Sequence, residues 1–459
     1  MPKFTLADIE KALGKVTIVE KGQQNFSDVT TDTRKITPGA LFVALKGERF
    51  NGENFIEDAV KQGANGVLVS NEYQPSGAEI GGTVIQAEFD TQTALQKLAH
   101  FWRMRFELPM IVITGSNGKT TTKDLTASVL SAKFPVLKTQ GNFNNEIGLP
   151  LTLLNMNETH RAAVVEIGMR GLGQIAALAP IAAPTIGIVT NVGETHMELL
   201  GSMENIAKAK AELVEVIPAG GTVILNNDNE FTAAMKDKAK AGVKVITFGI
   251  DNEADVKAFA VEGSTTETTF KCRLGKDGEV AEFTLPMVGR HNVSNALAAI
   301  TAGYVLGLSQ TEIQSGLTAL QMSAMRFETK RLGEYNIIND AYNASPMSME
   351  AAIKTLADIT KGRRIAVLGD MLELGDVSVS AHQKVGQQVA QSNATALIVY
   401  GPMGKEIAAG AKNAGMSAVY HVNTHAEAAD KLKEILQPED TVLFKGSRGM
   451  AMEKIIELL

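Results

Sequence analysis

One glycine-rich turn combines the residue types that bind a chain of phosphates. The segment IVITGSNGKTTT runs from β-branched residues into Gly115 and Gly118, then Lys119 and threonines. Glycines let backbone N–H groups close around phosphate oxygens, the lysine neutralises the β- and γ-phosphates, and the next hydroxyl can bind Mg²⁺. The two glycines are closer together than in the common G-x-x-x-x-G-K loop, and the alternative is a tight turn with an exposed lysine. We therefore expect an ATP site formed by Gly115, Ser116, Asn117, Gly118, Lys119, Thr120 and Thr121.

Acidic and imidazole side chains follow two other apolar runs. Glu166 ends the run AAVVE, and His196 and Glu198 follow the run IGIVTNV. Ligands of open α/β sheets bind at the carboxyl ends of strands, and Mg²⁺ prefers hard oxygen ligands. We therefore expect Glu166 and His196 to share a site with the glycine-rich turn, although a lone histidine can also have a purely structural role.

The segment SMENIAKAKAELVEVI has the apolar spacing of an amphipathic helix and carries Lys208 and Lys210. The two lysines lie about 200° apart around a helix axis, so only one of them can face a buried site. The spacing does not say which one, and an exposed lysine pair is the alternative. Near the end of the chain, KGSRGM at 445–450 is either an anion-contacting loop or an ordinary basic loop.

Alternating strand and helix patterns must position these residues. A strand–helix–strand pattern covers 41–70, a longer series begins with MIVIT, and another starts after Met322. Between 255 and 288 the alternation lacks helical spacing, which predicts an antiparallel hairpin insertion. We expect an α/β protein of three domains: a small α/β N-terminal domain (1–85), a central domain with a mostly parallel sheet and the phosphate-binding loop (86–322), and a C-terminal Rossmann-like domain (323–459).

Composition excludes several classes of protein. With 459 residues, 44% hydrophobic and 21% charged, the chain is typical of a compact enzyme of about three domains. The net charge of -7 and the lack of a long basic run argue against nucleic acid as a partner. Pro180 and Pro184 interrupt the most apolar stretch, which argues against a membrane span. The single Cys272 and the mixed polar start predict a cytoplasmic protein, and the absence of a heptad seam predicts a monomer.

A series of motifs resembles the Mur ligases of peptidoglycan synthesis over nearly the whole chain. In order they are TGSNGKTT, EIGM, TNVGETHMELLGS, AKAEL, GRHNVSNALAA, MRFE and NDAYNASPMSM. The stretches TTDTRKITPGALFVALKGERFNG, GNFNNEIGLPLTLL, GDMLELG and VLFKGSRGMAME are most similar to the member that joins D-alanyl-D-alanine to UDP-N-acetylmuramoyl-tripeptide. The resemblance implies an ADP-forming amide ligase that uses ATP to activate a carboxylate as an acyl phosphate.

The resemblance also implies a role for individual residues. It implies catalytic roles for Lys119, Glu166, His196 and Lys210, and two Mg²⁺ ions held by Thr120, Glu166, His196 and a carbamylated Lys210. It implies that Asn292 and Asn295 lie near the adenine, and that Arg326 and Asp340 bring the third domain to the nucleotide. It implies a UDP pocket lined by Thr31, Thr33, Lys46, Gly47 and Arg49, and a muramoyl region at Asn144 and Asn145. Ser345 stands where many relatives have asparagine.

Other functions would use the same glycine-rich turn. A P-loop ATPase or small-molecule kinase would need no UDP pocket, and a non-catalytic nucleotide-binding regulator would tolerate loss of Glu166 and His196. Within the family, the nearest rivals are a ligase for a different amino acid and a folylpolyglutamate synthetase, and the TDTR and ALKG stretches argue against the folate enzyme. The sequence does not tell lysine from diaminopimelate as the third residue of the tripeptide, nor whether a D-lactate depsipeptide is accepted.

Overall fold

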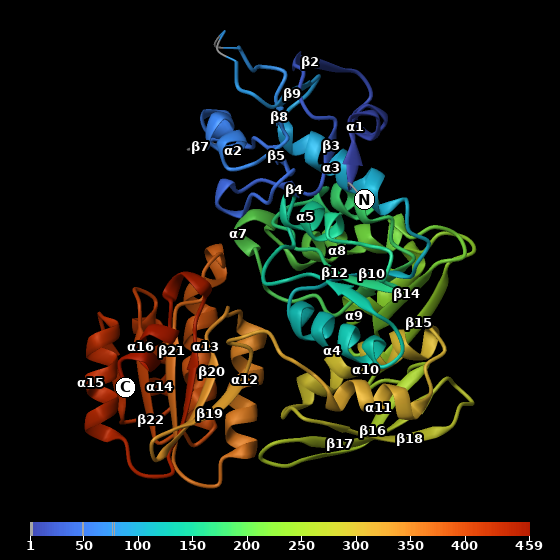
Figure 1. Cartoon of the computed structure of the whole chain (residues 1–459). Coiled ribbons are helices and arrows are strands. Elements are labelled where there is room, and N and C mark those ends of the chain that lie inside the picture. Colours follow the sequence, from blue (N-terminus) through green and yellow to red (C-terminus); the bar gives the residue numbers. More distant parts are fainter. Residues whose placement is uncertain (1–2, 48–49, 76, 78) are drawn as a thin grey trace. The chain divides into compact units, whose positions relative to one another are not determined.

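The computed structural model describes residues 3–47, 50–75, 77 and 79–459. The chain divides into two compact units, one made of Met1–Met110, Leu137–Ile167 and Ala176–Pro184, and the other of Ile111–Val136, Gly168–Ile175 and Thr185–Leu459. Three larger, mostly parallel sheets occur along the chain, each with its own helices. The predicted architecture of three α/β domains is therefore confirmed (Figure 1).

The first unit contains a five-stranded sheet in the order β2-β9-β8-β5-β4. Its strands are β2 (Val16–Glu20), β4 (Val29–Thr30), β5 (Leu41–Val43), β8 (Gly66–Val69) and β9 (Thr83–Ala87). All neighbouring pairs are parallel except β2 with β9. The predicted strand–helix–strand unit is β5, α2 (Ile56–Lys61) and β8, and its apolar side chains form one buried cluster with Phe42 and Val67.

The first unit also contains helices that flank the sheet and a strand that ends at a candidate site residue. Helix α1 (Leu6–Leu13) begins at a capping box formed by Thr5 and Asp8. Helix α3 (Thr91–Arg103) packs against α5 (Gly148–Leu154), and Trp102 on α3 donates from its indole N–H to the carbonyl of Met156 at 2.9 Å. Strand β12 (Ala162–Glu166) is wholly buried and ends at Glu166.

The most apolar stretch of the sequence forms α6 (Gln174–Ala182), a helix of 9 residues that contains Pro180. Within the described residues, no helix has both the length and the apolar character that a membrane crossing requires.

The central sheet of the second unit has a parallel core. Strands β10 (Met110–Thr114), β13 (Ile186–Val189), β14 (Thr222–Asn226) and β15 (Lys244–Gly249) are parallel neighbours in that order. Helices α4 (Lys119–Ser131), α8 (Met203–Val216), α10 (Arg290–Val305) and α11 (Gln310–Thr318) accompany them. Gly303 and Gly316 let α10 and α11 approach α4 closely, since a Cβ on either would lie within 3 Å of Val129.

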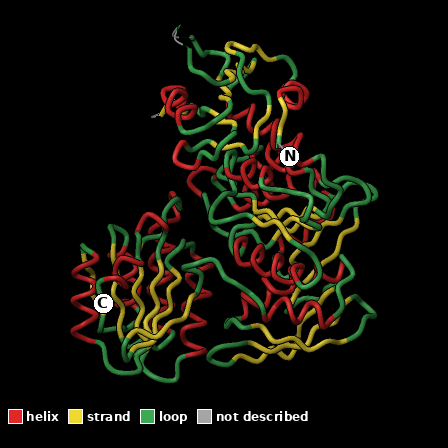
Figure 2. The backbone as a smooth tube through the Cα atoms, viewed as in Figure 1, coloured by secondary structure: helices red, strands yellow, loops and turns green. Residues whose placement is uncertain are grey.

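The region from 255 to 288 extends the central sheet instead of forming a separate insertion. Strands β16 (Val256–Gly263), β17 (Thr268–Leu274) and β18 (Val280–Leu285) follow β15 in the sheet, and the last two pairings are antiparallel. Figure 2 distinguishes the strands (yellow) from the loops that join them (green). The prediction of antiparallel strands is right, but their place at the edge of the same sheet depends on pairing that alternation alone cannot indicate.

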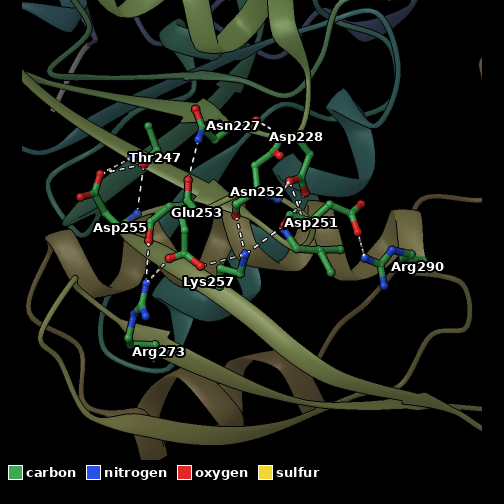
Figure 3. A network of polar contacts seen from close by, with 12 residues as sticks. Asn227, Asp228, Thr247, Asp251, Asn252, Glu253, Asp255, Lys257, Arg273 and Arg290 are labelled. Atoms are coloured by element: carbon green, nitrogen blue, oxygen red, sulfur yellow. Dashed lines mark hydrogen bonds and ion pairs between the residues drawn. The ribbon is translucent and has the colours of Figure 1, made fainter.

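A polar network fixes the turn between β15 and β16 (Figure 3). Asp228 accepts backbone N–H groups from Ile250, Asp251 and Asn252 at 2.6, 3.0 and 2.8 Å. The side chain of Asp251 in turn pairs with Arg290, the first residue of α10. The network therefore ties the start of α10 to the end of the parallel core.

The third sheet has the order β19-β20-β24-β21-β22-β23 and is parallel except for its edge strand β19. Its strands are β19 (Glu328–Leu332), β20 (Tyr335–Asp340), β21 (Arg364–Gly369), β22 (Ala396–Tyr400), β23 (Val419–Val422) and β24 (Thr441–Lys445). The helices are α12 (Pro346–Ile359), α13 (Ser378–Gln391), α14 (Gly404–Asn413), α15 (His425–Ile435) and α16 (Glu453–Glu457). Separate apolar clusters pack α12, α13 and α14 on one face and α15 and α16 on the other.

Candidate active site

The glycine-rich turn joins β10 to α4, and tertiary contacts explain both glycines. A Cβ on Gly115 would lie 1.9 Å from the hydroxyl of Thr190, at the end of the neighbouring strand β13. Gly118 has φ of 77° and ends the turn as the N-cap of α4, where a Cβ would lie 2.3 Å from Oδ1 of Asn295. The turn therefore fits between β13 and α10 only with glycine at these positions.

The segment that follows β13 holds the turn from one side. Ser116 donates its backbone N–H to the carbonyl of Asn191 and its hydroxyl to the carbonyl of Gly193, both at 2.9 Å. The backbone N–H of Asn117 donates to Oδ1 of Asn191 at 2.9 Å, and the Thr190 hydroxyl donates to the Asn117 carbonyl at 2.6 Å. Sequence reasoning missed Thr190 and Asn191. These two residues directly follow the apolar run IGIV of β13, which ends at the same edge of the sheet as β10.

Cationic side chains face this turn. The Lys119 ammonium donates to the carbonyls of Gly115 and Ser116 at 2.7 and 3.2 Å. Arg326 lies against the next residue and donates from Nη2 to the Thr120 hydroxyl at 3.0 Å. Arg326 also stacks on the ring of Tyr342, 3.8 Å from the ring centroid. The structure therefore brings Arg326 to the helix end that anions favour, where backbone N–H groups and a helix dipole point outward.

His196 lies at the start of α7 (Met197–Leu200) and contacts a carboxylate that sequence reasoning missed. Its Nδ1 is 2.5 Å from Oε2 of Glu373, which follows β21 within the motif GDMLELG. Burial lowers the pKa of His196; the Glu373 carboxylate partly opposes this, and the ammonium groups of Lys119 and Lys210 add to it. A neutral imidazole that donates an Nδ1–H hydrogen bond to Glu373 keeps the Nε2 lone pair for another ligand.

Helix α8 buries Lys210 and exposes Lys208. The structure thus decides which of the two lysines faces the interior, a question that the spacing left open. Burial lowers the pKa of Lys210 well below its ordinary value, and the positive charge of Lys119 lowers it further. Burial therefore disfavours the charged form of Lys210 relative to that of an exposed lysine.

The first unit brings Glu166 together with Asn144. The amide of Asn144 donates to Oε1 of Glu166 at 2.8 Å, and Glu166 is only 2% exposed. Asn145 has a different local role, since its Oδ1 accepts the backbone N–H of Gly148 at 2.8 Å at the start of α5. Both residues precede α5, the helix that packs on α3.

The residues predicted to line a UDP pocket also lie in the first unit. Thr31 follows β4, and Thr33 begins the short helix η1 (Thr33–Lys35). Lys46 and Gly47 form β6 (Lys46–Gly47), and the Lys46 ammonium is 2.5 Å from Oε2 of Glu72. Arg49 lies outside the described residues. Thr31 and Lys46 thus follow adjacent parallel strands, β4 and β5, at the same sheet edge.

Asn292 and Asn295 lie on α10 and are buried. Asn292 donates to the carbonyl of Val288 at 2.8 Å, and Asn295 Oδ1 accepts from the Thr122 hydroxyl on α4 at 3.3 Å. Asn292 and Arg326 line a cavity of about 340 Å³ in the second unit. Its remaining lining comes from Thr265, Thr266, Pro286, Met287, Val288, Met322, Ser323, Ala324, Phe327, Glu328 and Thr329. Asn295 does not line this cavity, and its side chain lies against the glycine-rich turn instead.

Asp340, at the end of β20, is already engaged by groups of its own domain. Its Oδ1 accepts the backbone N–H of Phe327 at 3.1 Å, and its Oδ2 is 2.5 Å from the buried Lys445 ammonium. Lys445 is therefore part of an internal ion pair. Ser345 caps α12 and donates its hydroxyl to Oδ1 of Asn117 at 2.8 Å, so this residue contacts the glycine-rich turn.

Acidification is expected to destabilise the second unit through His291. Burial lowers the pKa of His291 from 6.5 to about 4, and its ring packs edge-on against Phe327. The unfolded chain binds this proton below pH 6.5 and the folded chain only near pH 4, so stability is full above pH 6.5 and is lost as the pH falls through that window. The loss should reach about 1 to 3 kcal/mol.

Urea unfolding at pH 7 and at pH 5, followed by far-ultraviolet circular dichroism, measures this effect. His291→Gln should flatten the dependence of the unfolding midpoint on pH in this window. An equal dependence in the variant and the unaltered chain would assign the acid sensitivity to other groups.

Family models match three successive segments of the chain. They are described as Mur ligase family, catalytic domain (residues 25–103), Mur ligase middle domain (113–303) and Mur ligase, glutamate ligase domain (325–448). The middle-domain match contains the glycine-rich turn, His196, Lys210 and most of α10.

Curated relatives match from end to end. A UDP-N-acetylmuramoyl-tripeptide--D-alanyl-D-alanine ligase of Bacillus subtilis is 38% identical over 100% of this chain and 98% of its own length. The protein of that name in Escherichia coli is 34% identical over 98% of each chain.

Solved structures agree with these relatives. A crystal structure of MurF from Acinetobacter baumannii has a TM-score of 0.89 at 31% identity and covers 99% of this chain and 98% of its own. MurF ligase from Thermotoga maritima in complex with ADP has a TM-score of 0.83 at 26% identity, covering 94% of this chain and 96% of its own. A folylpolyglutamate synthase of Mycobacterium tuberculosis shares only the fold, at 17% identity and a TM-score of 0.63 over 80% of this chain and 94% of its own. Full-length identity above 30%, three matched segments and the geometry of the turn lead to one conclusion: this chain belongs to the Mur ligase family.

Proposed function

We propose that this protein is the ATP-dependent ligase that joins D-alanyl-D-alanine to UDP-N-acetylmuramoyl-tripeptide and forms the pentapeptide precursor of peptidoglycan. The observation that carries the substrate assignment is the end-to-end match to relatives named for this reaction, at 31–40% identity. The match includes the first domain, where TTDTRKITPGALFVALKGERFNG supplies the proposed UDP pocket.

The geometry of the second unit supports ATP as the phosphate donor. The turn from Gly115 to Gly118 presents the N-terminus of α4, and Lys119 and Arg326 add positive charge beside it. A relative with the same fold is named as a complex with ADP. We assign the triphosphate to this turn and the adenine to the cavity beside Asn292.

The donor set fits Mg²⁺ only after one chemical change. No group of three or more His, Cys, Asp or Glu side chains at metal-binding spacing occurs within the described part of the chain. Thr120 and Glu166 offer oxygen, His196 offers nitrogen, and Lys210 as an amine offers a poor ligand for a hard cation. Reaction of the neutral Lys210 amine with CO₂ releases a proton and forms a carbamate, which supplies the missing anionic oxygens.

We therefore propose two Mg²⁺ ions held by Thr120, Glu166, His196 and carbamylated Lys210. When bound, the ions would neutralise phosphate charge and orient the phosphate oxygens. The carbamate would also place a negative charge where Lys119 and His196 are influenced by Lys210.

The reaction then has two stages. The terminal carboxylate of the tripeptide attacks the γ-phosphorus of ATP, the bond to the β-phosphate oxygen breaks, and an acyl phosphate and ADP result. Lys119 stabilises the negative charge that develops on the phosphate oxygens. The amine of D-alanyl-D-alanine next attacks the acyl carbon, and the tetrahedral intermediate expels phosphate while the nitrogen loses a proton. Acyl phosphates hydrolyse readily, so the site must exclude water during both stages.

An ADP-release assay tests the assignment. ADP formation should require UDP-N-acetylmuramoyl-tripeptide and D-alanyl-D-alanine together, and mass spectrometry should find the pentapeptide product. Appreciable ADP release with ATP alone would favour an ATPase, and turnover with another amino acid would favour a different ligase of the family.

We further propose that the three domains span residues 1–85, 86–322 and 323–459, and that the protein is a monomer that acts in the cytoplasm.

A further inference from the structure

The linker between α11 and β19 (residues 319–327) is held by the central domain at Ser323. Its backbone N–H and its hydroxyl donate to Oδ2 of Asp124 at 3.0 and 2.7 Å. Asp124 lies on α4, is 1% exposed, and places its other oxygen 3.1 Å from the ammonium of Lys123. A buried carboxylate that accepts two hydrogen bonds from one linker residue is a strong anchor, since bonds to charged groups exceed those between neutral groups.

The same linker is held by the third domain only two residues later. The carbonyl of Met325 accepts the backbone N–H of Tyr342 at 3.3 Å, and Phe327 donates its N–H to Asp340 at 3.1 Å. Met325 and Phe327 have φ of 59° and 50°, a conformation that side chains other than glycine adopt at a cost. The surrounding contacts therefore impose this conformation on the residues that flank Arg326.

The two anchors together decide where the Arg326 side chain reaches. Thr120 and Asp124 are four residues apart on α4, so they share one face of the helix. Ser323 meets Asp124 on that face, and Arg326 meets Thr120 one turn nearer the glycine-rich turn. Arg326 Nε is buried with no hydrogen-bond partner among the residues that the structure describes, which leaves a donor for an incoming oxygen.

We propose that Asp124 is a positioning residue of the nucleotide site: through Ser323 it sets the linker on α4 so that Arg326 meets Thr120 and the phosphates. This inference rests on the proposed use of ATP. It adds to that proposal a buried carboxylate that does not itself contact the nucleotide.

Ser323→Ala tests the inference better than a change of Asp124, because removal of that carboxylate would also remove its ion pair with the buried Lys123. The variant loses one of the two bonds to Asp124. We expect the KM for ATP to rise about five- to tenfold, with kcat changed less than about threefold. Ser323→Thr keeps a hydroxyl and should restore the KM. Ser128→Ala is the matched control: Ser128 is also on α4, but its hydroxyl donates to Gly316 on α11, so the KM should stay at the wild-type value.

A double-mutant cycle separates positioning from a general structural role. In an Arg326→Ala background, Ser323→Ala should cause no further rise in the KM, because the anchor acts through Arg326. Two results would overturn the inference without affecting the proposed ligase activity of the unaltered chain. One is an independent five- to tenfold rise in the KM in that background, and the other is an unchanged KM for Ser323→Ala alone.

Calorimetry with ADP distinguishes failure of this inference from failure of the proposed function. If the unaltered chain does not bind ADP, both the proposed function and this inference are overturned.

Discussion

Lys119→Ala is expected to lower the rate of ligation by about 10³-fold or more, because the ammonium stabilises charge that develops on the phosphate in the transition state. This ammonium donates to the carbonyls of Gly115 and Ser116, at the turn where the triphosphate is proposed to bind. The side chain is partly exposed and does not belong to the apolar core, so the thermal midpoint should shift by only a few degrees, about the effect of 1 kcal/mol.

Single-turnover measurement of ADP and acyl phosphate formation gives the clearest result for this variant. Lys133→Ala is a suitable control, since it removes an exposed lysine beyond the other end of the same helix, where the ammonium bonds to the carbonyl of Gly307. A wild-type rate for Lys119→Ala would remove the glycine-rich turn from the mechanism. A large loss of thermal stability would show that the lysine acts mainly in folding.

Lys210→Ala is expected to lower the ligation rate by at least about 10²-fold, because it removes the only side chain of α8 that can supply a carbamate to the proposed metal site. Burial and the Lys119 charge hold the pKa of Lys210 low, which favours the neutral amine that CO₂ requires. A small carboxylate such as acetate or formate should restore part of the activity in the variant, since it supplies similar oxygen ligands.

Lys208→Ala provides a matched control on the same helix, because this lysine is exposed and two residues away. Its activity should stay within about twofold of the unaltered chain, as expected for a surface change. Removal of CO₂ and bicarbonate should slow the unaltered enzyme and leave Lys210→Ala unaffected. Activity of Lys210→Ala near the wild-type level, with no response to bicarbonate or carboxylates, would contradict the carbamate.

Elements with strong local signals were predictable from sequence. Strand β10 coincides with the run MIVIT, and α4 begins at Lys119, because a run of apolar and β-branched residues that ends in two closely spaced glycines makes one sharp junction. Strand β19 was missed, since four of its five residues are exposed and polar, as an edge strand permits. The hairpin that contains it closes between Leu332 and Tyr335, so only its pairing with β20 reveals it.

In the candidate site, too, some residues were predictable from the sequence and others were not. The motifs indicated Lys119, Glu166, His196 and Lys210, but none of them indicated Glu373, which lies 177 residues from His196 and contacts it. Ser345 was noted only as an unusual residue, and the structure gives its hydroxyl a bond to Asn117 on the phosphate-binding turn. These partners come from separate parts of the chain, and local patterns carry no information about such pairs.

By itself, the sequence determined the glycine-rich turn between a strand and a helix, the three α/β domains and the family, because glycine conformation, hydrophobic period and motif order are local properties of the chain. Only the tertiary structure decided that Lys210 and not Lys208 is buried, that Asp340 is paired with Lys445, and that Asp124 holds the linker. Burial and ion pairing depend on which surfaces pack together, and packing sets the local dielectric environment that lowers the pKa of a buried lysine.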